Sequence, residues 1–432
     1  MKAGIHGRAV NTGFPRSREW PIEIQGNVQL KTQAGDPGAF AEFDLNRVDS
    51  PAFVVDAAKL RDNCRILAEI GEASGAKVLS ALKAFSMWKA APIIGDYLDG
   101  VCASGLWEAR LASEFYDGEI ATYSPAYKPD ELEEICRLSD HVIFNSPTQI
   151  MRAAQILEAA RATGGDIDVG LRVNPLHAEG EVPRYDPAAP HSRLGFPINQ
   201  LEDDHFALLD GIHMHTLCEQ TFAPLARTWD KVFDHLEPYF GQFDWINFGG
   251  GHHITRADYE RDELVQFLID VADDTGAQVY IEPGEAVALD AGILVGTVLD
   301  THWNAMPIAI TDVSATCHIP DVLEAPYRPA MLGEQPRDTA MADASDDDIR
   351  SGAVRLGGPS CLAGDVIGDY QLPVPCEPGA RFAFLDQAHY SMVKTTTFNG
   401  VPLPSIWLRD SETDALECVK RFEYDDFRDR LS

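Results

Sequence analysis

Short apolar runs alternate with longer, helix-like segments along the first two thirds of the chain. Eight of these runs are strand candidates, and they lie at residues 78–82, 100–103, 119–123, 141–145, 167–174, 211–216, 244–248 and 278–282. Most of the intervening segments are long enough to form a helix. Eight strands in strict alternation with helices are the number that closes a (β/α)8 TIM-type barrel. An open, doubly wound sheet is the alternative, although it rarely needs so many strands.

Two helices of this pattern carry clear end signals. A strand-like run at 51–56 is followed by a helical pattern from Ala57 to about Ser74, where Gly75 stops it. A second helix is predicted to begin at residue 147, because Ser146 is suited to the N-cap, a proline follows it, and Gln149 completes a capping box.

The sequence pattern changes near residue 301. From there on prolines are frequent, and short β-type runs appear at 307–313, 381–385 and 405–408. We therefore expect a division into a barrel over residues 57–300 and a mostly β domain made of 1–56 and 301–432. Residues 1–50 look like a polar extension with room for one or two short strands. The acidic run at 343–348 predicts a solvated loop.

Composition narrows the classes of partner. The chain has 432 residues, and its hydrophobic content of 45% and charged content of 24% are globular values. No apolar run follows the basic N-terminal residues, and none is long enough to span a membrane, so we expect a cytoplasmic protein. A formal charge of −33 disfavours nucleic acid as a partner. It is compatible with a small cationic ligand, with a salt-adapted host, or simply with a solubilising acidic surface.

A metal centre is a possibility that the cysteines and histidines raise. The eight cysteines contain no CxxC pair, which argues against a zinc site and against a disulfide framework. His213 and His215 would lie on one face of the sixth strand, as in some metal-dependent barrel hydrolases. However, no lone aspartate ends the eighth strand, and a flat imidazole stacked on a cofactor ring suits His215 better.

The carboxyl ends of the barrel strands carry the chemistry, since barrel enzymes place their sites there. A lysine at the end of a buried strand, Lys83, is unusual, and it either reaches solvent or is functional. The glycines at 249–251 are either a flexible turn or a loop whose N–H groups approach a phosphate. Glu282 either caps the following helix or pairs with a ring nitrogen. Together these three features predict a pyridoxal phosphate (PLP) site.

Nine segments, in order between residues 51 and 400, carry a resemblance to a known family: 80–85, 101–111, 191–195, 213–219, 247–253, 282–286, 317–326, 357–365 and 388–395. The chain resembles the fold-type III, alanine racemase-like PLP decarboxylases, which include the ornithine and diaminopimelate decarboxylases. Within that family it is most similar to the carboxynorspermidine/carboxyspermidine decarboxylases. Residues 1–50 are not covered by the resemblance.

The resemblance implies a role for each residue of the predicted site. It makes Lys83 the lysine that binds PLP covalently, and it places Cys361 in a loop that a partner subunit contributes, so a homodimer with shared sites is implied. Cys361 is also our candidate for the acid that protonates the α-carbon. The remaining residues are expected at the cofactor: His215 on the ring, Glu282 at the pyridine nitrogen, Gly249, Gly250, Gly251 and Tyr390 at the phosphate, and Arg172 nearby.

Glu285 marks a departure from the ornithine enzymes, which have arginine at the matching position. A glutamate there suits an amine of the substrate, and Asp321 is a second candidate for the same role, although either could be an ordinary surface acid. We therefore expect PLP-dependent decarboxylation of carboxynorspermidine or carboxyspermidine, small polyamine substrates, to norspermidine or spermidine. The alternatives are a decarboxylase of the same fold acting on another amino acid such as diaminopimelate, a metal-dependent hydrolase, and a non-catalytic PLP-binding protein.

Overall fold

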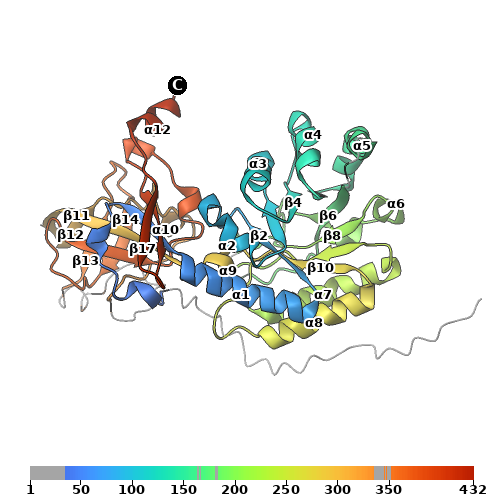
Figure 1. Ribbon diagram of the computed structural model, residues 1–432, viewed down its shortest axis with the longest axis horizontal. Helices are drawn as coiled ribbons and strands as arrows, with labels where there is room; N and C mark the ends of the chain where they lie inside the picture. Colours follow the sequence, from blue (N-terminus) through green and yellow to red (C-terminus); the bar gives the residue numbers. More distant parts are fainter. Residues whose placement is uncertain are drawn as a thin grey trace, which may run out of the picture.

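The computed structural model describes residues 35–162, 165, 167–180, 183–334, 345, 347 and 352–432. It has two lobes, a barrel surrounded by helices and a mostly β domain, which lie side by side in Figure 1. Residues 1–34 of the predicted extension lie outside the described residues, as does most of the acidic run at 343–348.

The barrel consists of eight parallel strands, and the prediction of a closed (β/α)8 barrel is confirmed. Around the barrel the strand order is β5-β4-β3-β2-β10-β9-β8-β6, and pairing of β5 with β6 closes the circle. Every predicted strand is present, with its ends within three residues of the expected positions. The strands are β2 (Lys77–Ala81), β3 (Gly100–Ala103), β4 (Glu119–Tyr123), β5 (His141–Phe144), β6 (Asp168–Asn174), β8 (Gly211–His213), β9 (Trp245–Asn247) and β10 (Gln278–Ile281), and β7 (Phe196–Pro197) pairs with β6.

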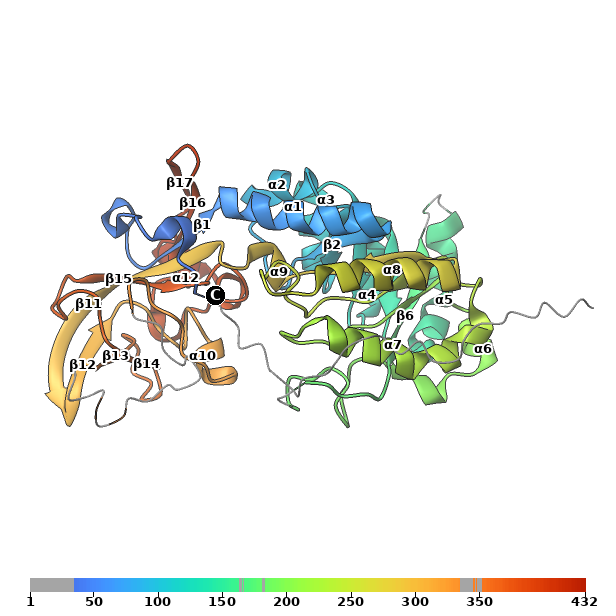
Figure 2. The same ribbon diagram turned by 90° about the horizontal axis from the view of Figure 1, so that it is seen from below.

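Helices cover the outside of the barrel, and α1 and α8 run next to each other along one side (Figure 2). Gly75 ends α1 in the left-handed conformation, as predicted. At the start of α5 the side chain of Gln149 accepts from the N–H of Asn145, one residue earlier than a capping box requires. The helices are α1 (Ala57–Ser74), α2 (Ala91–Gly95), α3 (Leu106–Phe115), α4 (Pro129–Leu138), α5 (Pro147–Ala162), α6 (Asp203–Phe206), α7 (Phe222–Leu236), α8 (Arg261–Thr275) and α9 (Glu285–Ala288).

The interior of the barrel is filled by side chains. Trp245 is almost fully buried there with Leu79, Ile143 and Tyr280. Gly211 faces the indole so closely that a Cβ on it would lie 2.1 Å from the ring. Because the interior is packed, polar chemistry has room only at the ends of the barrel.

The second lobe is a sheet with the strand order β14-β13-β12-β11-β1-β16-β17, and β15 also pairs with β11. Its strands are β1 (Ala52–Asp56), β11 (Gly292–Asn304), β12 (Met306–Thr311), β13 (Val354–Gly357), β14 (Val366–Tyr370), β15 (Arg381–Leu385), β16 (Ser405–Asp410) and β17 (Ala415–Lys420). The short helices α10 (Asp321–Glu324) and α12 (Tyr424–Asp429) accompany them. β11 begins at Gly292, ahead of the boundary expected at residue 300, because its first residues already pair with β1.

The described part of the N-terminal extension contains two 3-10 helices, Gly38–Phe40 and Leu45–Arg47, and no strand. Phe40, Phe43 and Val48 are buried in one cluster with residues of β1, β11 and β15. Residues 35–50 are therefore part of the sheet domain's core. None of the helices in the described part of the chain combines the length and the apolar character that a bilayer crossing requires.

Candidate active site

Lys83 lies in a tight turn directly after β2. Its side chain is exposed, whereas its neighbours Leu82 and Ala84 are fully buried. The turn is held from two sides: the N–H of Ala81 donates to Pro283 O at 2.9 Å, and Ala84 O accepts from the N–H of Tyr390 at 2.8 Å. The last barrel strand and the sheet domain thus both fix the lysine's backbone.

Although Lys83 keeps accessible surface, the protein packed around its ammonium restricts hydration and so lowers its pKa, and the positive charge of Arg172 lowers it further. The negative charge of Glu282 acts in the other direction. A lysine with a lowered pKa is more often neutral, which is the form that attacks a carbonyl carbon. The position and the electrostatics of Lys83 therefore suit covalent binding of an aldehyde.

Glu282 follows β10 and is buried between two donors. Asn247 Nδ2 donates to Oε1 at 2.8 Å, and His213 Nε2 lies 3.2 Å from Oε2. Burial acts to raise the pKa of Glu282, but His213, the hydrogen bond from Asn247 and the charge of Lys83 outweigh it, so the pKa is lowered. Glu282 is thus an ionised carboxylate, as a partner of a protonated ring nitrogen must be.

Flat side chains line up next to Glu282. The rings of His215 and His213 are nearly parallel with centroids 6.4 Å apart, and His213 is 5.7 Å from Tyr123 in the same orientation. The guanidinium of Arg172 lies 4.7 Å from the centre of the Tyr123 ring and donates to His215 O at 2.7 Å. Burial lowers the pKa of both histidines, so both rings are neutral.

The three glycines after β9 allow the loop to approach its neighbours closely. A Cβ on Gly250 would lie 2.1 Å from Glu282 O, and a Cβ on Gly251 would lie 2.0 Å from Leu217 O. The N–H of Gly249 donates to Asn247 Oδ1 at 2.8 Å, and the N–H of Gly250 donates to His215 Nδ1 at 3.1 Å. Two of the three N–H groups expected at the phosphate therefore have partners within the protein.

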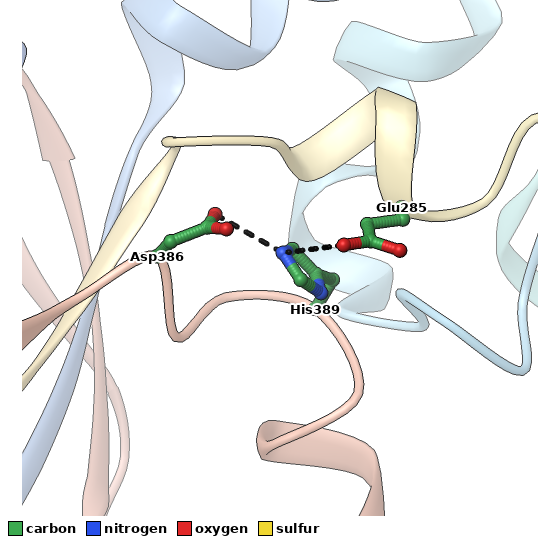
Figure 3. Close-up of side chains that lie close together, drawn as sticks. All are labelled: Glu285, Asp386 and His389. Carbon is green, nitrogen blue, oxygen red and sulfur yellow. Dashed lines mark ion pairs between the residues drawn. The ribbon is translucent and has the colours of Figure 1, made fainter. Parts of the chain in front are cut away.

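Glu285, at the start of α9, lies between two histidines, of which His389 is drawn with it in Figure 3. Its Oε2 lies 3.1 Å from His253 Nε2, and its Oε1 lies 3.7 Å from His389 Nε2. His389 Nε2 is also 3.0 Å from Asp386, so this imidazole lies between a carboxylate of the barrel and one of the sheet domain. Burial acts to lower the pKa of His389, but Asp386 and Glu285 raise it to about 10. A protonated His389 therefore joins the two domains.

The histidines that follow or end the barrel strands have partners within the protein. His213 contacts Glu282, His215 accepts from Gly250, and His252 Nδ1 pairs with the hydroxyl of Tyr259 at 2.6 Å. Within the described ranges, the group whose potential ligand atoms lie within 4.8 Å of one another consists of Glu285, Asp386 and His389.

Asp321 and Cys361 have different surroundings from the other predicted residues. Asp321 forms an ion pair with Lys394, whose ammonium also donates to Glu324 at 2.6 Å. Cys361 is exposed on the sheet domain, and its N–H donates to Asn399 Oδ1 at 2.7 Å. The described contacts of Cys361 thus do not reach Lys83 of the same chain.

Four residues of the site had no such role in the sequence-based prediction: Asn247, His253, Asp386 and His389. Asn247, His253 and His389 lie in segments that carry the family resemblance, but their partners are distant in sequence. His213 was considered only as a metal ligand, and the structure pairs it with Glu282 instead.

Comparisons with known proteins agree with this geometry. The family described as pyridoxal-dependent decarboxylase, C-terminal sheet domain, matches residues 52–388. A carboxynorspermidine/carboxyspermidine decarboxylase of Campylobacter jejuni is 40% identical over 385 residues, which are 88% of this chain and 98% of the relative. A carboxyaminopropylagmatine decarboxylase of Synechocystis is 36% identical over 90% of this chain and 96% of its own.

The solved structures include a crystal structure of the carboxynorspermidine decarboxylase of Campylobacter jejuni in complex with norspermidine. It superposes with a TM-score of 0.79 at 38% identity and covers 89% of this chain and 100% of its own. The match spans both the barrel and the sheet domain. The chain therefore belongs to the pyridoxal-dependent decarboxylase family, with PLP as its cofactor.

Proposed function

We propose that the substrate of this decarboxylase is a carboxylated polyamine, carboxynorspermidine or carboxyspermidine. The observation that carries the proposal is the concentration of carboxylates next to the Lys83 turn, which Gly284, the residue before Glu285, approaches closely at Ala84. The charge of Glu285, together with burial, raises the pKa of Glu219 to about 7, so the two carboxyl groups are close enough to repel each other. Such a site suits a substrate that carries several ammonium groups. The names of the Campylobacter relative and of its norspermidine complex support the same substrate class.

The residues around Lys83 fit PLP. In the proposal, Lys83 binds the cofactor covalently, His215 stacks on its ring, and Glu282 pairs with the ring nitrogen. Arg172 lies near the cofactor, and Gly249, Gly250, Gly251 and Tyr390 surround its phosphate. The lowered pKa of Lys83, the ionised Glu282 and the close backbone approach of the glycines support these roles. Since Gly249 and Gly250 donate elsewhere, the N–H of Gly251 is the candidate phosphate donor of the loop.

PLP supplies an electron sink for the pair released when the bond to the carboxyl group breaks. The protein contributes by keeping the cofactor ring protonated, because the protonated ring accepts electrons more readily. Glu282 does so by keeping a proton on the ring nitrogen, and its own lowered pKa prevents it from taking that proton. Cys361 is the proposed acid that gives a proton to the α-carbon.

Glu285 and Asp321 are the proposed contacts of the substrate's amines. Both already have cationic partners within the protein: the two histidines at Glu285, and Lys394 at Asp321. A substrate ammonium must therefore share these carboxylates or displace Lys394. The expected selectivity is for a chain of ammonium groups over a substrate that ends in a carboxylate, such as diaminopimelate.

We also propose that the protein is a cytoplasmic homodimer. Cys361 is exposed, and its described contact is with Asn399 rather than with Lys83 of its own chain, which supports its delivery to the site of a second subunit. All eight cysteines are free thiols, which supports a reducing compartment. Size measurement by light scattering at several concentrations tests the dimer, and a monomer at micromolar concentration would contradict it.

Release of carbon dioxide tests the substrate class. Carboxynorspermidine, carboxyspermidine, carboxyaminopropylagmatine and diaminopimelate should be compared at equal concentration, because the Synechocystis relative is named for the third of these. We expect turnover of one or both of the first two to exceed that of diaminopimelate by about 100-fold, because a buried polar group left unpaired costs up to about 3 kcal/mol. Preference for diaminopimelate would refute the proposal, and absence of any turnover would favour a non-catalytic PLP protein.

A matched pair of variants tests the substrate contact at Asp321. Asp321 and Glu324 both pair with Lys394, but only Asp321 is proposed to contact substrate. We expect Asp321→Asn to raise KM by about tenfold, as loss of a hydrogen bond to a charged group predicts. Glu324→Gln should leave KM within about twofold, because exposed ion pairs contribute little. Equal effects of the two variants on KM would show that Asp321 acts through its ion pair with Lys394 and does not contact the substrate.

A further inference from the structure

His213 is a buried residue behind the proposed ring-nitrogen partner. It is 1% exposed, and its Nε2 lies 3.2 Å from Oε2 of Glu282, which is 6% exposed. We propose that His213 is a positioning residue, whose Nε2–H holds the Glu282 carboxylate in the orientation that pairs with the ring nitrogen of PLP. This inference rests on the proposed role of Glu282.

The backbone places two donors at the same height of the barrel. His213 and Asn247 are register partners on the neighbouring strands β8 and β9, and Glu282 directly follows β10, the strand beyond β9. Asn247 donates to one carboxylate oxygen and His213 contacts the other. Because each carboxylate oxygen has its own donor, the carboxylate of Glu282 cannot rotate freely about the Cγ–Cδ bond. The remaining lone pairs are then aimed in fixed directions.

The tautomer of His213 follows from its contacts. Nδ1 is buried and has no hydrogen-bond partner among the described residues, whereas Nε2 faces an ionised carboxylate. The single proton of a neutral ring therefore belongs on Nε2. Burial lowers the pKa of His213, which agrees with a neutral ring. A neutral donor orients Glu282 without neutralising its charge, so the full charge remains for the cofactor.

The ring of His213 is itself held in place. It is nearly parallel to Tyr123, with an interplanar angle of 14°, and Tyr123 donates to Asn145 Oδ1 at 2.7 Å. This packing prevents the imidazole from turning away from Glu282. Other titratable or charged groups also act on this pair, and they are unchanged in the variants below: Lys83, Arg172, Cys102, His141 and His215.

Two substitutions separate the hydrogen bond from the ring. His213→Phe keeps a flat ring against Tyr123 but has no donor, and His213→Gln keeps an N–H donor without the ring. The PLP dissociation constant is measured by removing the cofactor and titrating it back, with visible absorbance as the signal. We expect His213→Phe to weaken PLP binding by about tenfold or more, the effect of losing a hydrogen bond to a charged group. His213→Gln should remain within about threefold of wild type.

The pH dependence of PLP binding is a second readout. Without the donor, burial raises the pKa of Glu282, so the ratio of the His213→Phe constant to the wild-type constant should grow as the pH falls from 8 to 6. Taking the ratio removes the titration of PLP itself. In a Glu282→Gln background the His213→Phe substitution should have a smaller effect on PLP binding, because a neutral amide oxygen accepts a weaker hydrogen bond than a carboxylate.

Several results would overturn the inference. A His213→Phe protein with wild-type affinity, a His213→Gln protein as weak as His213→Phe, or an undiminished effect in the Glu282→Gln background would each do so. Circular dichroism melting checks folding, and if His213→Phe does not fold, His213→Met takes its place as a donor-free variant. A wild-type protein that does not bind PLP would instead refute the cofactor site, whereas turnover of an unexpected amino acid would leave the role of His213 intact.

Discussion

Replacement of Gly249 by alanine tests whether the glycine loop shapes the cofactor site. Gly249 has φ +65°, and an added Cβ would lie 2.7 Å from Cβ and Nδ1 of His215 and from Met214 O. Ordinary contacts begin at 3.4 Å, so the shortfall is about 0.7 Å (3.4 minus 2.7). Because two of these contacts are with the Cβ of His215 and the backbone of Met214, the glycine loop and His215 must move apart. His215 is the residue proposed to stack on PLP.

Two costs of this substitution can be separated. The left-handed backbone alone costs an alanine about 1–2 kcal/mol. Gly276, at the end of α8, has φ +73° and no atom within 4 Å of an added Cβ, so Gly276→Ala incurs the backbone cost without the collision. Both variants should therefore lose about 1 kcal/mol of unfolding free energy or more. Only Gly249→Ala should displace the cofactor-binding ring.

The assay is a PLP titration of both variants after removal of the cofactor, with urea unfolding of the same preparations. We expect the dissociation constant of Gly249→Ala to rise by about 10- to 100-fold, in line with the effect of sub-ångström to 1 Å misplacement in a site. Gly276→Ala should bind PLP within about twofold of wild type. Equal PLP affinity of the two variants would refute the idea that close approach of Gly249 to His215 shapes the site.

Two further predictions concern the lysine and the domain junction. Lys83→Ala should purify without the visible absorbance of covalently bound PLP. As a control, replacement of the surface residue Lys89 by alanine should leave this absorbance unchanged. A visible spectrum of each protein is the measurement, and absorbance in Lys83→Ala would show that PLP binds to a different lysine. The pKa of His389 is raised from 6.5 to about 10, so its stabilising effect is complete below about pH 6.5 and is lost as the pH rises through 10. The unfolding free energy lost in His389→Phe, measured in urea, should therefore shrink from pH 6 to pH 10, and a constant difference would contradict the ion pairs with Asp386 and Glu285.

The sequence predicted the barrel well because its signals are local. Each strand is a short apolar run and each helix has an amphipathic pattern, so eight of them could be counted without knowing their partners. The rule that barrel sites lie at the carboxyl ends of strands then brought Lys83, His215 and Glu282 together. The beginning of β11 was missed, because pairing with β1 determines it and no local signal marks it.

Partners that come from distant parts of the chain could not be predicted. Glu285 was expected to be available to substrate, yet it lies between His253 and His389, one from the barrel and one from the sheet domain. Asp321 was likewise expected to be available, but Lys394 pairs with it. Identifying such pairs requires the tertiary arrangement of segments that lie far apart in the sequence, which no periodicity encodes.

The division of labour between the two domains follows from these contacts. The groups proposed to hold the cofactor come almost entirely from the barrel, where Glu282, His213 and Asn247 are fixed by neighbouring strands. The segment after β15 belongs to the sheet domain, and it brings His389 to Glu285 and the backbone of Tyr390 to the Lys83 turn. Because His389 adjusts charge at the proposed substrate side without contacting Glu282, its substitution can alter the accepted amine while PLP binding stays the same. Selection for a new polyamine should therefore act first on the junction between the domains.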